Sequence, residues 1–450
     1  MNLISDMLIS WSGQGEPVHK LDELLAWIEE RNQNLVVNIV PNRLSESNFW
    51  LYDEQTGHIR NQTHSFFEIS GMRCGEIEQP IILQNEIGYL GILAKEINGV
   101  LHFLMQAKIE PGNINKIQIS PTIQATKSNF TQKHGGNRPA YLDYFVEADK
   151  HTIIVDQIQS EQSSRFYKKR NRNIVLLVED VVEVLPGHKW MTLRQLKQLM
   201  HYDNLVNMDT RTVLSCLPMA MLDDERGKMR KYFTDQSLYN SMFDAAEPDD
   251  MAVIYNYINN YKMFDYAQPK LVRLDELQNW QMDDFGIRCK EPYSFSVIYC
   301  DIEVEGREVR RWTQPLFKAE GIAMFGLFTT VIAGKRRFLV KAQAEIGCFD
   351  GMELGPTVQR EAVCQEPENE MDRLFMEQVK AGKGVRHDVI LSEEGGRFYH
   401  EQNRNVILET EAFEPPKGYF WADYKTLNLL TQVNNCLNIQ LRNLLSLLEV

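Results

Sequence analysis

The sequence lacks the features that would place it in several common functional classes. It has no apolar run near the roughly 20 residues that a membrane helix requires. Its 48 Lys and Arg stand against 62 Asp and Glu, giving a net charge of −14, whereas a general nucleic-acid-binding surface needs a basic footprint. The opening stretch MNLISDMLISWSGQGEP has no basic n-region and no long apolar segment, so no signal peptide is expected.

Cofactor and metal motifs are also missing. There is no GxGxxG after a strand, no GxxxxGK[ST], no HExxH and no GxSxG, and the ten His show no metal-ligand spacing. The seven Cys form no CxxC pair, and such a scattered, odd set is typical of reduced thiols in a cytoplasmic protein. We therefore expect no metal and no cofactor, and chemistry carried by carboxylates, Lys, Tyr and His.

What the chain does have is one stretch that occurs twice. The first copy is SEQSSRFYKKRNRNIVL from Ser160, and the second is SEEGGRFYHEQNRNVIL from Ser392. Over 19 positions, Ile158–Leu176 against Ile390–Leu408, ten residues are identical, and most of these are polar or aromatic. Diverged repeats usually keep apolar positions instead. The surviving polar identities indicate either a site built twice or a polar network that the fold requires.

The duplication extends over most of the chain. Pro80–Thr126 aligns with Pro315–Glu361 without a gap, and further matches make 18–217 and 248–448 two versions of one unit. Units of about 200 residues can each bury their own core. We expect a first unit in 1–217 that holds the active pocket, a connector in 218–247 and a second unit in 248–450.

Hydrophobic periodicity predicts both helices and strands in each unit. Apolar residues at three and four spacing predict an opening helix over 21–33 and over 249–264. Strands are expected at 65–69 and 294–304, and a helix pair closes each unit. The predicted fold class is α+β, a tandem duplication of a unit in which helices cover a mixed sheet.

Alternation in the middle of each unit places polar side chains on one strand face. In HFLMQAKIEPG, the period of two puts Gln106, Lys108 and Glu110 together. The next stretch, INKIQISPTIQAT, is expected to be one strand with its own polar face. Such faces form either a wall of hydrogen-bonding groups or a surface in solvent. The second face carries Gln118, Ser120, Thr122, Gln124 and Thr126. In copy two, Lys341, Gln343 and Glu345 match the first face, and Thr357 and Gln359 match the second.

The copies diverge after Thr126. Copy one continues KSNFTQKHGGNRPAYLDYF, which is rich in Gly, Asn and single charges. Copy two continues EAVCQEPENEMDRLFMEQVKAGKG, which predicts a helix followed by a turn. Such a difference in composition is typical between a loop that takes part in function and a loop that only connects two elements. The loop of copy one is therefore a candidate part of the site.

Two long stretches resemble a known family. QPIILQNEIGYLGILAKEINGVLHFLMQAKIEPGNINKIQISPTIQATKSNFTQKHGG, together with SRFYKKRNRN from Ser164, resembles the NDP-hexose 2,3-dehydratases of deoxysugar biosynthesis. The resemblance covers nearly the whole chain and implies two Nudix-like α/β/α units per chain and a homodimer. Neither copy has the Nudix signature GX5EX7REUXEEXGU, so metal-dependent pyrophosphate hydrolysis is not implied. Copy two has WTQP from Trp312, where copy one has IEQP and lacks the expected aromatic.

The resemblance implies a dTDP-4-keto-6-deoxyhexose substrate that loses its C2 hydroxyl. The C4 ketone acidifies the C3 hydrogen, a base removes that proton, and an acid helps the hydroxyl leave. The enol then tautomerises to a 3,4-diketo-2,6-dideoxyhexose, which a downstream 3-ketoreductase would consume. Because the redox change is internal, no nicotinamide is needed. The alternative is a nucleotide-sugar-binding protein on the same scaffold that does not catalyse.

Candidate catalytic residues come from the polar strand face and the divergent loop. Elimination needs one group that takes a proton and one that gives it. We expect these groups to be Lys108 and Glu110, with His134 or Tyr141 from the loop.

Candidate substrate-binding residues lie mainly in the repeated motif. Arg165 and Arg172 suit a diphosphate because a guanidinium binds phosphate oxygens bidentately. An internal salt bridge to Glu161 or another carboxylate is the alternative for each. The other predicted ligands are Gln106, Thr122, Gln124, Lys127, Asn129, Glu161, Tyr167, Asn171 and Asn173. A second pocket is predicted from Trp312, Gln314, Lys341, Gln359, Arg397, Tyr399, Asn403, Arg404 and Asn405.

Overall fold

A computed structural model describes most of the chain. The described residues are 3–33, 35–127, 138–220, 226–244, 248–304, 310–364 and 366–450. Two predicted site residues, Asn129 and His134, lie outside them. The remaining predicted residues all have a described position.

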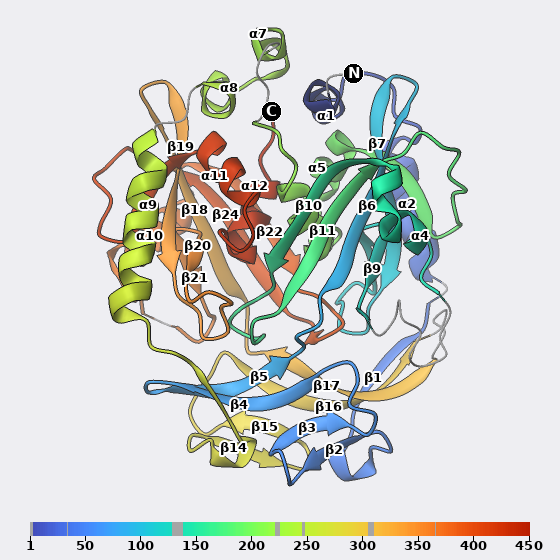
Figure 1. Ribbon diagram of the computed structural model, residues 1–450, viewed down its shortest axis with the longest axis vertical. Helices are drawn as coiled ribbons and strands as arrows, with labels where there is room; N and C mark the ends of the chain where they lie inside the picture. Colours follow the sequence, from blue (N-terminus) through green and yellow to red (C-terminus); the bar gives the residue numbers. More distant parts are fainter. Residues whose placement is uncertain are drawn as a thin grey trace.

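Two large mixed sheets, one from each copy, stand side by side in the upper part of the molecule (Figure 1). In the first sheet the order is β10-β11-β6-β7-β12, and β11 runs parallel to β6 while the other neighbours are antiparallel. The second sheet has the order β20-β19-β18-β24-β22, with β24 parallel to β18; its β25 pairs with β19 as β12 pairs with β7, and its β20 corresponds to β8. The α+β class with mixed sheets is therefore confirmed. The strands are β6 (Gly88–Ile97), β7 (Val100–Ile109), β8 (Ile117–Ser120), β9 (Ile123–Ala125), β10 (Thr152–Ser160), β11 (Arg170–Leu177), β12 (His188–Thr192), β18 (Ala323–Ile332), β19 (Lys335–Gln343), β20 (Glu353–Gly355), β21 (Val358–Arg360), β22 (Val385–Ser392), β24 (Gln402–Glu409) and β25 (Tyr419–Asp423).

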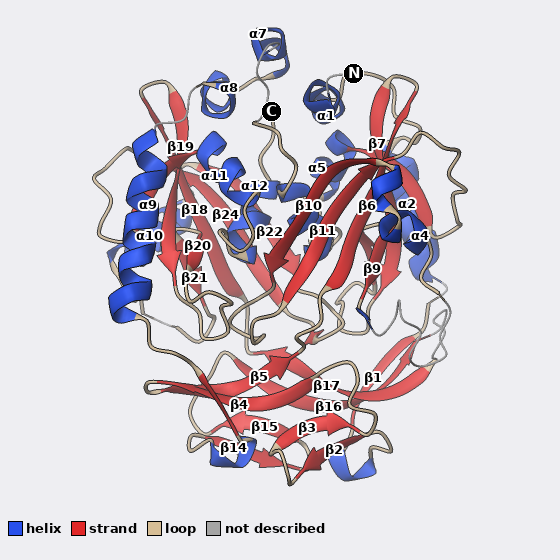
Figure 2. Ribbon diagram, in the orientation of Figure 1, coloured by secondary structure: helices blue, strands red, loops and turns tan. Residues whose placement is uncertain are grey.

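Below these sheets lies a layer made mainly of strands, with the short 3-10 helices Leu44–Glu46 and Leu274–Glu276, and the two copies exchange strands in it (Figure 2). β1 of copy one pairs with β16 of copy two, and β13 of copy two pairs with β4 of copy one. Aromatic residues of both copies share one core here, including Phe67 and Phe295. The layer consists of β1 (Val37–Pro41), β2 (Trp50–Asp53), β3 (His58–Asn61), β4 (Glu68–Cys74), β5 (Ile77–Leu83), β13 (Lys270–Val272), β14 (Trp280–Asp283), β15 (Gly286–Cys289), β16 (Phe295–Val304), β17 (Arg311–Ala319) and β23 (Phe398–Tyr399).

Helices from both copies fill the space between the upper sheets (Figure 1). α6 of copy one and α12 of copy two belong to one continuous apolar core that crosses the boundary between the copies. None of the described helices is long and apolar enough to span a membrane. The helices are α1 (Leu3–Ser12), α2 (Leu21–Gln33), α4 (Leu142–Val146), α5 (Leu193–Leu199), α6 (Met208–Ser215), α7 (Arg226–Met229), α8 (Gln236–Phe243), α9 (Pro248–Asn260), α10 (Glu370–Ala381), α11 (Tyr424–Thr431) and α12 (Ile439–Ser446).

Most predicted elements are present. The helix predicted over 21–33 is α2, and the one over 249–264 is α9 followed by a π-helical turn, Tyr261–Asp265. The strand over 294–304 is β16, whereas the one predicted at 65–69 starts only at Glu68.

The prediction of one continuous strand from INKIQISPTIQAT is wrong. β8 ends at Ser120 and pairs with β7, while β9 begins at Ile123 and pairs with β6. Pro121 at the break has no N–H for a ladder. The Thr122 hydroxyl donates to the Leu104 carbonyl (2.5 Å) and accepts from the Leu93 amide (2.9 Å). This hydroxyl therefore links β6 and β7 through hydrogen bonds, and Thr122 is 2% exposed.

The divergent segment contains a helix in both copies. The helix predicted in copy two is α10, and copy one places the shorter α4 at the equivalent position. Phe145 of α4 packs over Gly91, and Phe375 of α10 packs over Gly326. A Cβ on either glycine would lie within 2.4 Å of the ring atoms, so both glycines are required for this close approach.

Candidate active site

Glu110 is the centre of a buried polar cluster directly after β7. Its Oε1 lies 3.0 Å from Nζ of Lys108 and accepts from Nε2 of Gln124 at 3.0 Å. Its Oε2 accepts from the amide of Gly395 at 3.1 Å. Hydrogen bonds to the ionised form favour a carboxylate, and Lys108 adds a neighbouring positive charge. Glu110 is 3% exposed, so this pair is positioned by the fold and not by solvent.

The Gly395 contact shows that each motif docks on the opposite copy. The amide of Gly112 donates to the Gly395 carbonyl (2.7 Å), and the amide of His400 donates to the Gly112 carbonyl (2.8 Å). The other copy repeats both bonds: Gly347 donates to Ser163 (2.8 Å), and Lys168 donates to Gly347 (2.7 Å). We call the side-chain cluster where the strand end of copy one meets the motif of copy two the first pocket, and the cluster at the reverse combination the second pocket.

Two further carboxyl groups face Glu110 in the first pocket. Asp209 opens α6 and is 3% exposed. Burial, reinforced by Glu161, Glu394 and Glu110, raises the pKa of Asp209 well above its ordinary value. Close carboxylates disfavour one another's charged forms, so these groups hold their protons more strongly than isolated carboxyls do.

Glu394 belongs to the motif of copy two and is partly exposed. Burial of its carboxyl group raises its pKa to about 7, with Glu110 and Glu161 adding to the shift and Arg397 and Lys108 opposing it. Its carboxyl is thus poised to give up a proton near neutral pH.

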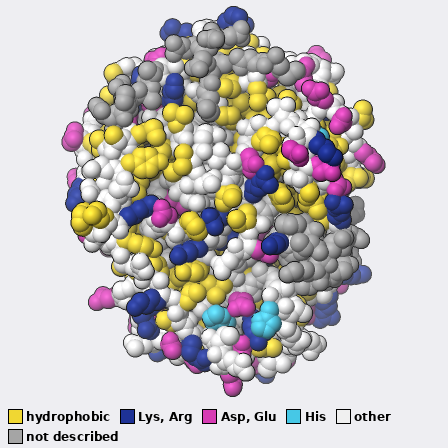
Figure 3. Space-filling view, viewed as in Figure 1, with side chains coloured by type: hydrophobic (Ala, Val, Ile, Leu, Met, Phe, Trp, Pro, Cys, Tyr) yellow, Lys and Arg dark blue, Asp and Glu magenta, His cyan; other side chains and the backbone are white. Residues whose placement is uncertain are grey.

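Cations line the same pocket. The guanidinium of Arg397 lies over the Phe67 ring at 4.4 Å and donates to Oε1 of Gln84 at 3.1 Å. Lys169, which is 6% exposed, donates to the Glu86 carbonyl (2.5 Å), and burial lowers its pKa while Glu161 opposes the shift. Acidic and basic side chains are interspersed on the face in Figure 3. An anionic ligand is therefore attracted by these local cations and not by a basic surface.

The second pocket has a different set of groups. Arg165 is 2% exposed, lies over Phe295 at 4.3 Å and is paired with Glu361 at 3.2 Å. Oε1 of Glu345 accepts from Nε2 of Gln359 at 2.7 Å, and burial raises the pKa of Glu345 to about 7. Gln343 stands where copy one has Lys108, so this carboxyl lacks the lysine partner that Glu110 has.

The second arginine of the motif is held in an internal salt bridge in both copies. Arg172 binds Asp156 with two hydrogen bonds of 2.7 and 2.6 Å, and Arg404 binds Asp388 in the same way at 2.8 and 2.6 Å. The structure thus shows the salt-bridge alternative for both arginines, and neither guanidinium lies among the carboxyl groups described above.

The motif amides form part of a polar network. Asn171 donates to Glu161, and Asn403 donates to Glu393, each at 2.5 Å. Asn173 and Asn405 donate to the carbonyls of Asn171 and Asn403. These polar identities therefore hold the motif in shape.

The motif serines link the copies. Ser160 of copy one donates to Glu353 of copy two (2.7 Å), and Gln118 of copy one donates to Ser392 of copy two (2.5 Å). The serine of each motif thus bonds a strand of the other copy.

The other predicted residues are dispersed. The Tyr141 hydroxyl bonds Glu183 and Leu185 near α4, and Lys127 is exposed just after β9. Nζ of Lys341 lies over the Tyr419 ring at 5.8 Å. Gln106 pairs with Ser120 and His188 in the sheet, and Tyr167 binds Ile82 through its backbone, while Tyr399 stacks on His400.

Trp312 and Gln314 lie beside the motif that enters the first pocket. Nε1 of Trp312 donates to Gln314, and Nε2 of Gln314 donates to the Gly396 carbonyl at 2.9 Å. Because Gly396 follows Gly395 in the docked motif, an aromatic ring stands at the edge of the first pocket although β17 belongs to copy two.

Sequence analysis did not identify Glu394, Asp209 or Lys169. The signal was available in the alignment of the two copies. There Glu394 aligns with Gln162, Asp209 with Gln440, and Lys169 with Glu401. Charge differences within otherwise matching stretches mark the places where the two pockets differ.

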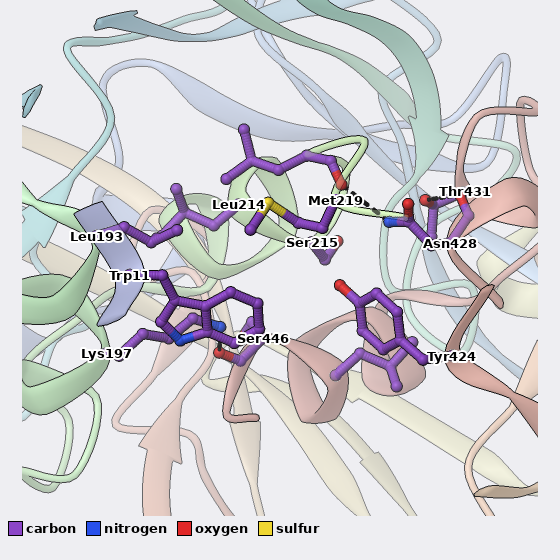
Figure 4. A pocket seen from close by; sticks show the side chains of 12 residues that line it. Trp11, Leu193, Lys197, Leu214, Ser215, Met219, Tyr424, Asn428, Thr431 and Ser446 are labelled. Carbon is purple, nitrogen blue, oxygen red and sulfur yellow. Dashed lines mark hydrogen bonds between the residues drawn. The ribbon is translucent and has the colours of Figure 1, made fainter. Parts of the chain in front are cut away.

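An enclosed cavity of about 20 Å³ lies elsewhere, between the copies (Figure 4). Lys197 and Trp11 lie on one side of it, and Tyr424 and Asn428 lie on the other. This space suits a single water and is too small for a sugar nucleotide. Within the described ranges, no group of three His, Cys, Asp or Glu is arranged to hold a metal ion.

A duplicated α+β chain with paired proton-transfer groups beside buried cations fits an enzyme acting on an anionic substrate. A model of the NDP-hexose 2,3-dehydratase family matches residues 21–217 and 251–448. Proteins named dTDP-4-dehydro-6-deoxy-alpha-D-glucopyranose 2,3-dehydratase are similar over nearly the whole length. The one from Saccharopolyspora spinosa is 37% identical, covering 95% of this chain and 91% of its own. The one from Amycolatopsis orientalis is 33% identical, covering 95% and 90%, and that from Streptomyces violaceoruber is 35% identical, covering 94% and 95%. The chain belongs to the NDP-hexose 2,3-dehydratase family.

Proposed function

We propose that this protein removes the C2 hydroxyl of a dTDP-4-keto-6-deoxyhexose, with the glucose-derived sugar as substrate. The observation that carries the proposal is the Lys108–Glu110 pair in a pocket that also holds partly protonated carboxyls. The names of the relatives give the substrate class. The reaction is a hydro-lyase step that yields a 3,4-diketo-2,6-dideoxyhexose.

The first pocket supplies the groups that the elimination needs. Glu110, paired with the Lys108 ammonium, serves as the base at the C3 hydrogen. The Lys108 ammonium faces the C4 oxygen, where negative charge develops as the C3 proton leaves. A fixed cation at that oxygen stabilises the transition state more than the ground state. A neutral carboxyl is then required at the C2 hydroxyl.

The nucleotide is held by the docked motif. Arg397 is the diphosphate ligand of the first pocket because its side chain is partly exposed and its guanidinium donates to a neutral amide, that of Gln84. Trp312 provides a face for base stacking. In the second pocket Arg165 is the equivalent group, although Glu361 competes for it.

A coupled assay separates this function from that of a binding protein without catalysis. The purified chain is incubated with dTDP-4-keto-6-deoxyglucose and a 3-ketoreductase, and the products are followed by mass spectrometry. With the reductase's nicotinamide present as hydride donor, a dehydratase yields a sugar nucleotide that has lost one water and gained one hydride and one proton. Tight binding of the substrate with no change in its mass would establish the binding-protein alternative.

We expect dehydration to proceed without an added metal or nicotinamide. The elimination transfers protons only, and its redox change stays within the sugar. Turnover is measured after exhaustive EDTA treatment and desalting. Activity that disappears and returns only with a divalent ion would contradict this expectation.

We also expect two dTDP molecules to bind per chain, with unequal affinities. Arg397 is more exposed than Arg165, so the first pocket binds more tightly. Isothermal titration calorimetry with dTDP should resolve two sites, with Arg397→Ala removing the tighter one and Arg165→Ala the weaker. A single site that is unaffected by Arg165→Ala would leave the second pocket without a nucleotide-binding role.

The broader architecture extends this proposal. We propose that each unit, 1–217 and 248–450, is Nudix-like, which the helices on the faces of each mixed sheet support. The chain is proposed to act as a cytoplasmic homodimer, which light scattering would test through its mass in solution. A 3-ketoreductase would act next, because a 3,4-diketone is a reactive product.

A further inference from the structure

We propose that Glu394, contributed by the motif of copy two, is the proton donor to the departing C2 hydroxyl in the first pocket. This inference rests on the proposed 2,3-dehydration and names a group for one of its steps. It makes the active pocket a product of both copies: the base and the C4 cation come from copy one, and the acid comes from copy two.

The two copies differ at the positions around this carboxyl. Copy two has Glu394, Gly395 and Gly396 where copy one has Gln162, Ser163 and Ser164. Gln162 is 2% exposed, whereas Glu394 is partly exposed. Of the two matched positions, only the one beside Lys108 carries a carboxyl, and that side chain is partly exposed.

Glycine at position 396 makes room for the carboxyl. A Cβ at Gly396 would lie 2.3 Å from Oε1 of Glu394 and 3.9 Å from Oε1 of Glu110. Glu394 thus folds back beside Gly396, on the side that faces Glu110. A larger residue at 396 would displace the Glu394 carboxyl from this position, because a contact of 2.3 Å is far inside van der Waals distance.

The surroundings raise the pKa of Glu394 to near neutrality. The facing groups are Arg397 on its own segment, Glu110 and Lys108 from β7 and its end, Glu161 after β10, and Asp209 at the start of α6. Burial, Glu110 and Glu161 together outweigh the facing cations Arg397, Lys108 and Lys169, and the pKa of Glu394 rises to about 7. Because a general acid must be protonated to act, the elimination rate falls as the pH rises through this value.

The proposed step balances in protons and electrons. Glu110 takes the C3 proton, and the electron pair of that C–H bond forms the C3–C4 enolate. The enolate collapses to restore the C4 carbonyl and form a C2=C3 bond, and the C2–O bond breaks with its electron pair on oxygen. Glu394 protonates that oxygen, which leaves as water. The proton on Glu110 then returns to Glu394, either directly or through solvent.

The decisive variant is Glu394→Gln, which keeps the shape and removes the acid. With substrate in D₂O, it should still exchange the C3 hydrogen for deuterium, seen as loss of the H3 signal by proton NMR. Dehydration should fall at least about 100-fold, the lower end for one proton-transfer group. The high-pH limb of the wild-type rate profile should also disappear. A merely structural role would reduce exchange and dehydration together.

Controls keep the outcomes distinct. Glu110→Gln should lose both exchange and dehydration, and Gln162→Ala, a larger change at the matched position of the second pocket, should reduce dehydration far less than Glu394→Gln. Dehydration by Glu394→Gln at the wild-type rate, or equal losses of exchange and dehydration, would overturn the assignment. A wild-type protein that does not dehydrate the substrate would instead overturn the proposed function.

Discussion

Glu110→Gln is expected to lower turnover at least about 100-fold, the lower end of the contribution of one proton-transfer group. Glutamine keeps the size of the side chain and can still accept a hydrogen bond, but it cannot take the C3 proton. The matched change, Glu345→Gln, is expected to cause a much smaller loss. Initial rates in the coupled assay, with near-UV circular dichroism to verify folding, measure the difference.

Lys108→Ala belongs to the same comparison. Removing the ammonium leaves the C4 oxygen without its cation and Glu110 without its ion-pair partner, so a loss of similar size is expected. The second pocket is a real competitor, since Glu345 and Glu401 both have a pKa raised to about 7. Equal losses for Glu110→Gln and Glu345→Gln, or a loss only for the latter, would contradict the assignment of catalysis to the first pocket.

Gly112→Ala is expected to cost about 3 kcal/mol or more of unfolding free energy, at the upper end for overpacking. A Cβ at this position would lie 1.7 Å from the carbonyl oxygen of Phe398. Backbone atoms on both sides cannot move away without breaking the bonds between Gly112, Gly395 and His400. Activity should fall with stability, because the docked motif carries Glu394 and Arg397.

Urea unfolding measures this effect, and Gly227→Ala provides the control. A Cβ on Gly227 in α7 meets nothing within 4 Å, so alanine there should be neutral or stabilise by up to about 1 kcal/mol through helix propensity. Equal stability of Gly112→Ala and wild type would mean that the two copies do not dock through this glycine.

The sequence was sufficient to predict the duplication, most helices and the main strands, because periodicity and repeated residues are local signals. It could not show that each motif docks on the opposite copy. The strand ends at Gly112 and Gly347 have the same local pattern, so nothing nearby in the sequence distinguishes pairing within a copy from pairing between copies. That choice depends on contacts between residues more than 280 positions apart, such as Glu110 and Gly395.

The site was predicted in part for the same reason. A period of two is enough to place Lys108 and Glu110 on one strand face, and the structure joins them. Arg172 was ambiguous, because a guanidinium suits a phosphate and a carboxylate equally, and only the fold reveals Asp156 beside it. Glu394 was missed because its importance comes from the carboxyls and glycines that surround it in space.

The central claim is that this protein expels the C2 hydroxyl of its sugar substrate, and an isotope experiment tests it most directly. The 4-keto sugar nucleotide is labelled with oxygen-18 at the C2 hydroxyl only, incubated with the enzyme and a 3-ketoreductase, and the product is analysed by mass spectrometry. The account predicts a dehydrated product that has lost all of the label, with the label recovered in water. A dehydrated product that retains the label would contradict it, because another hydroxyl would then have departed.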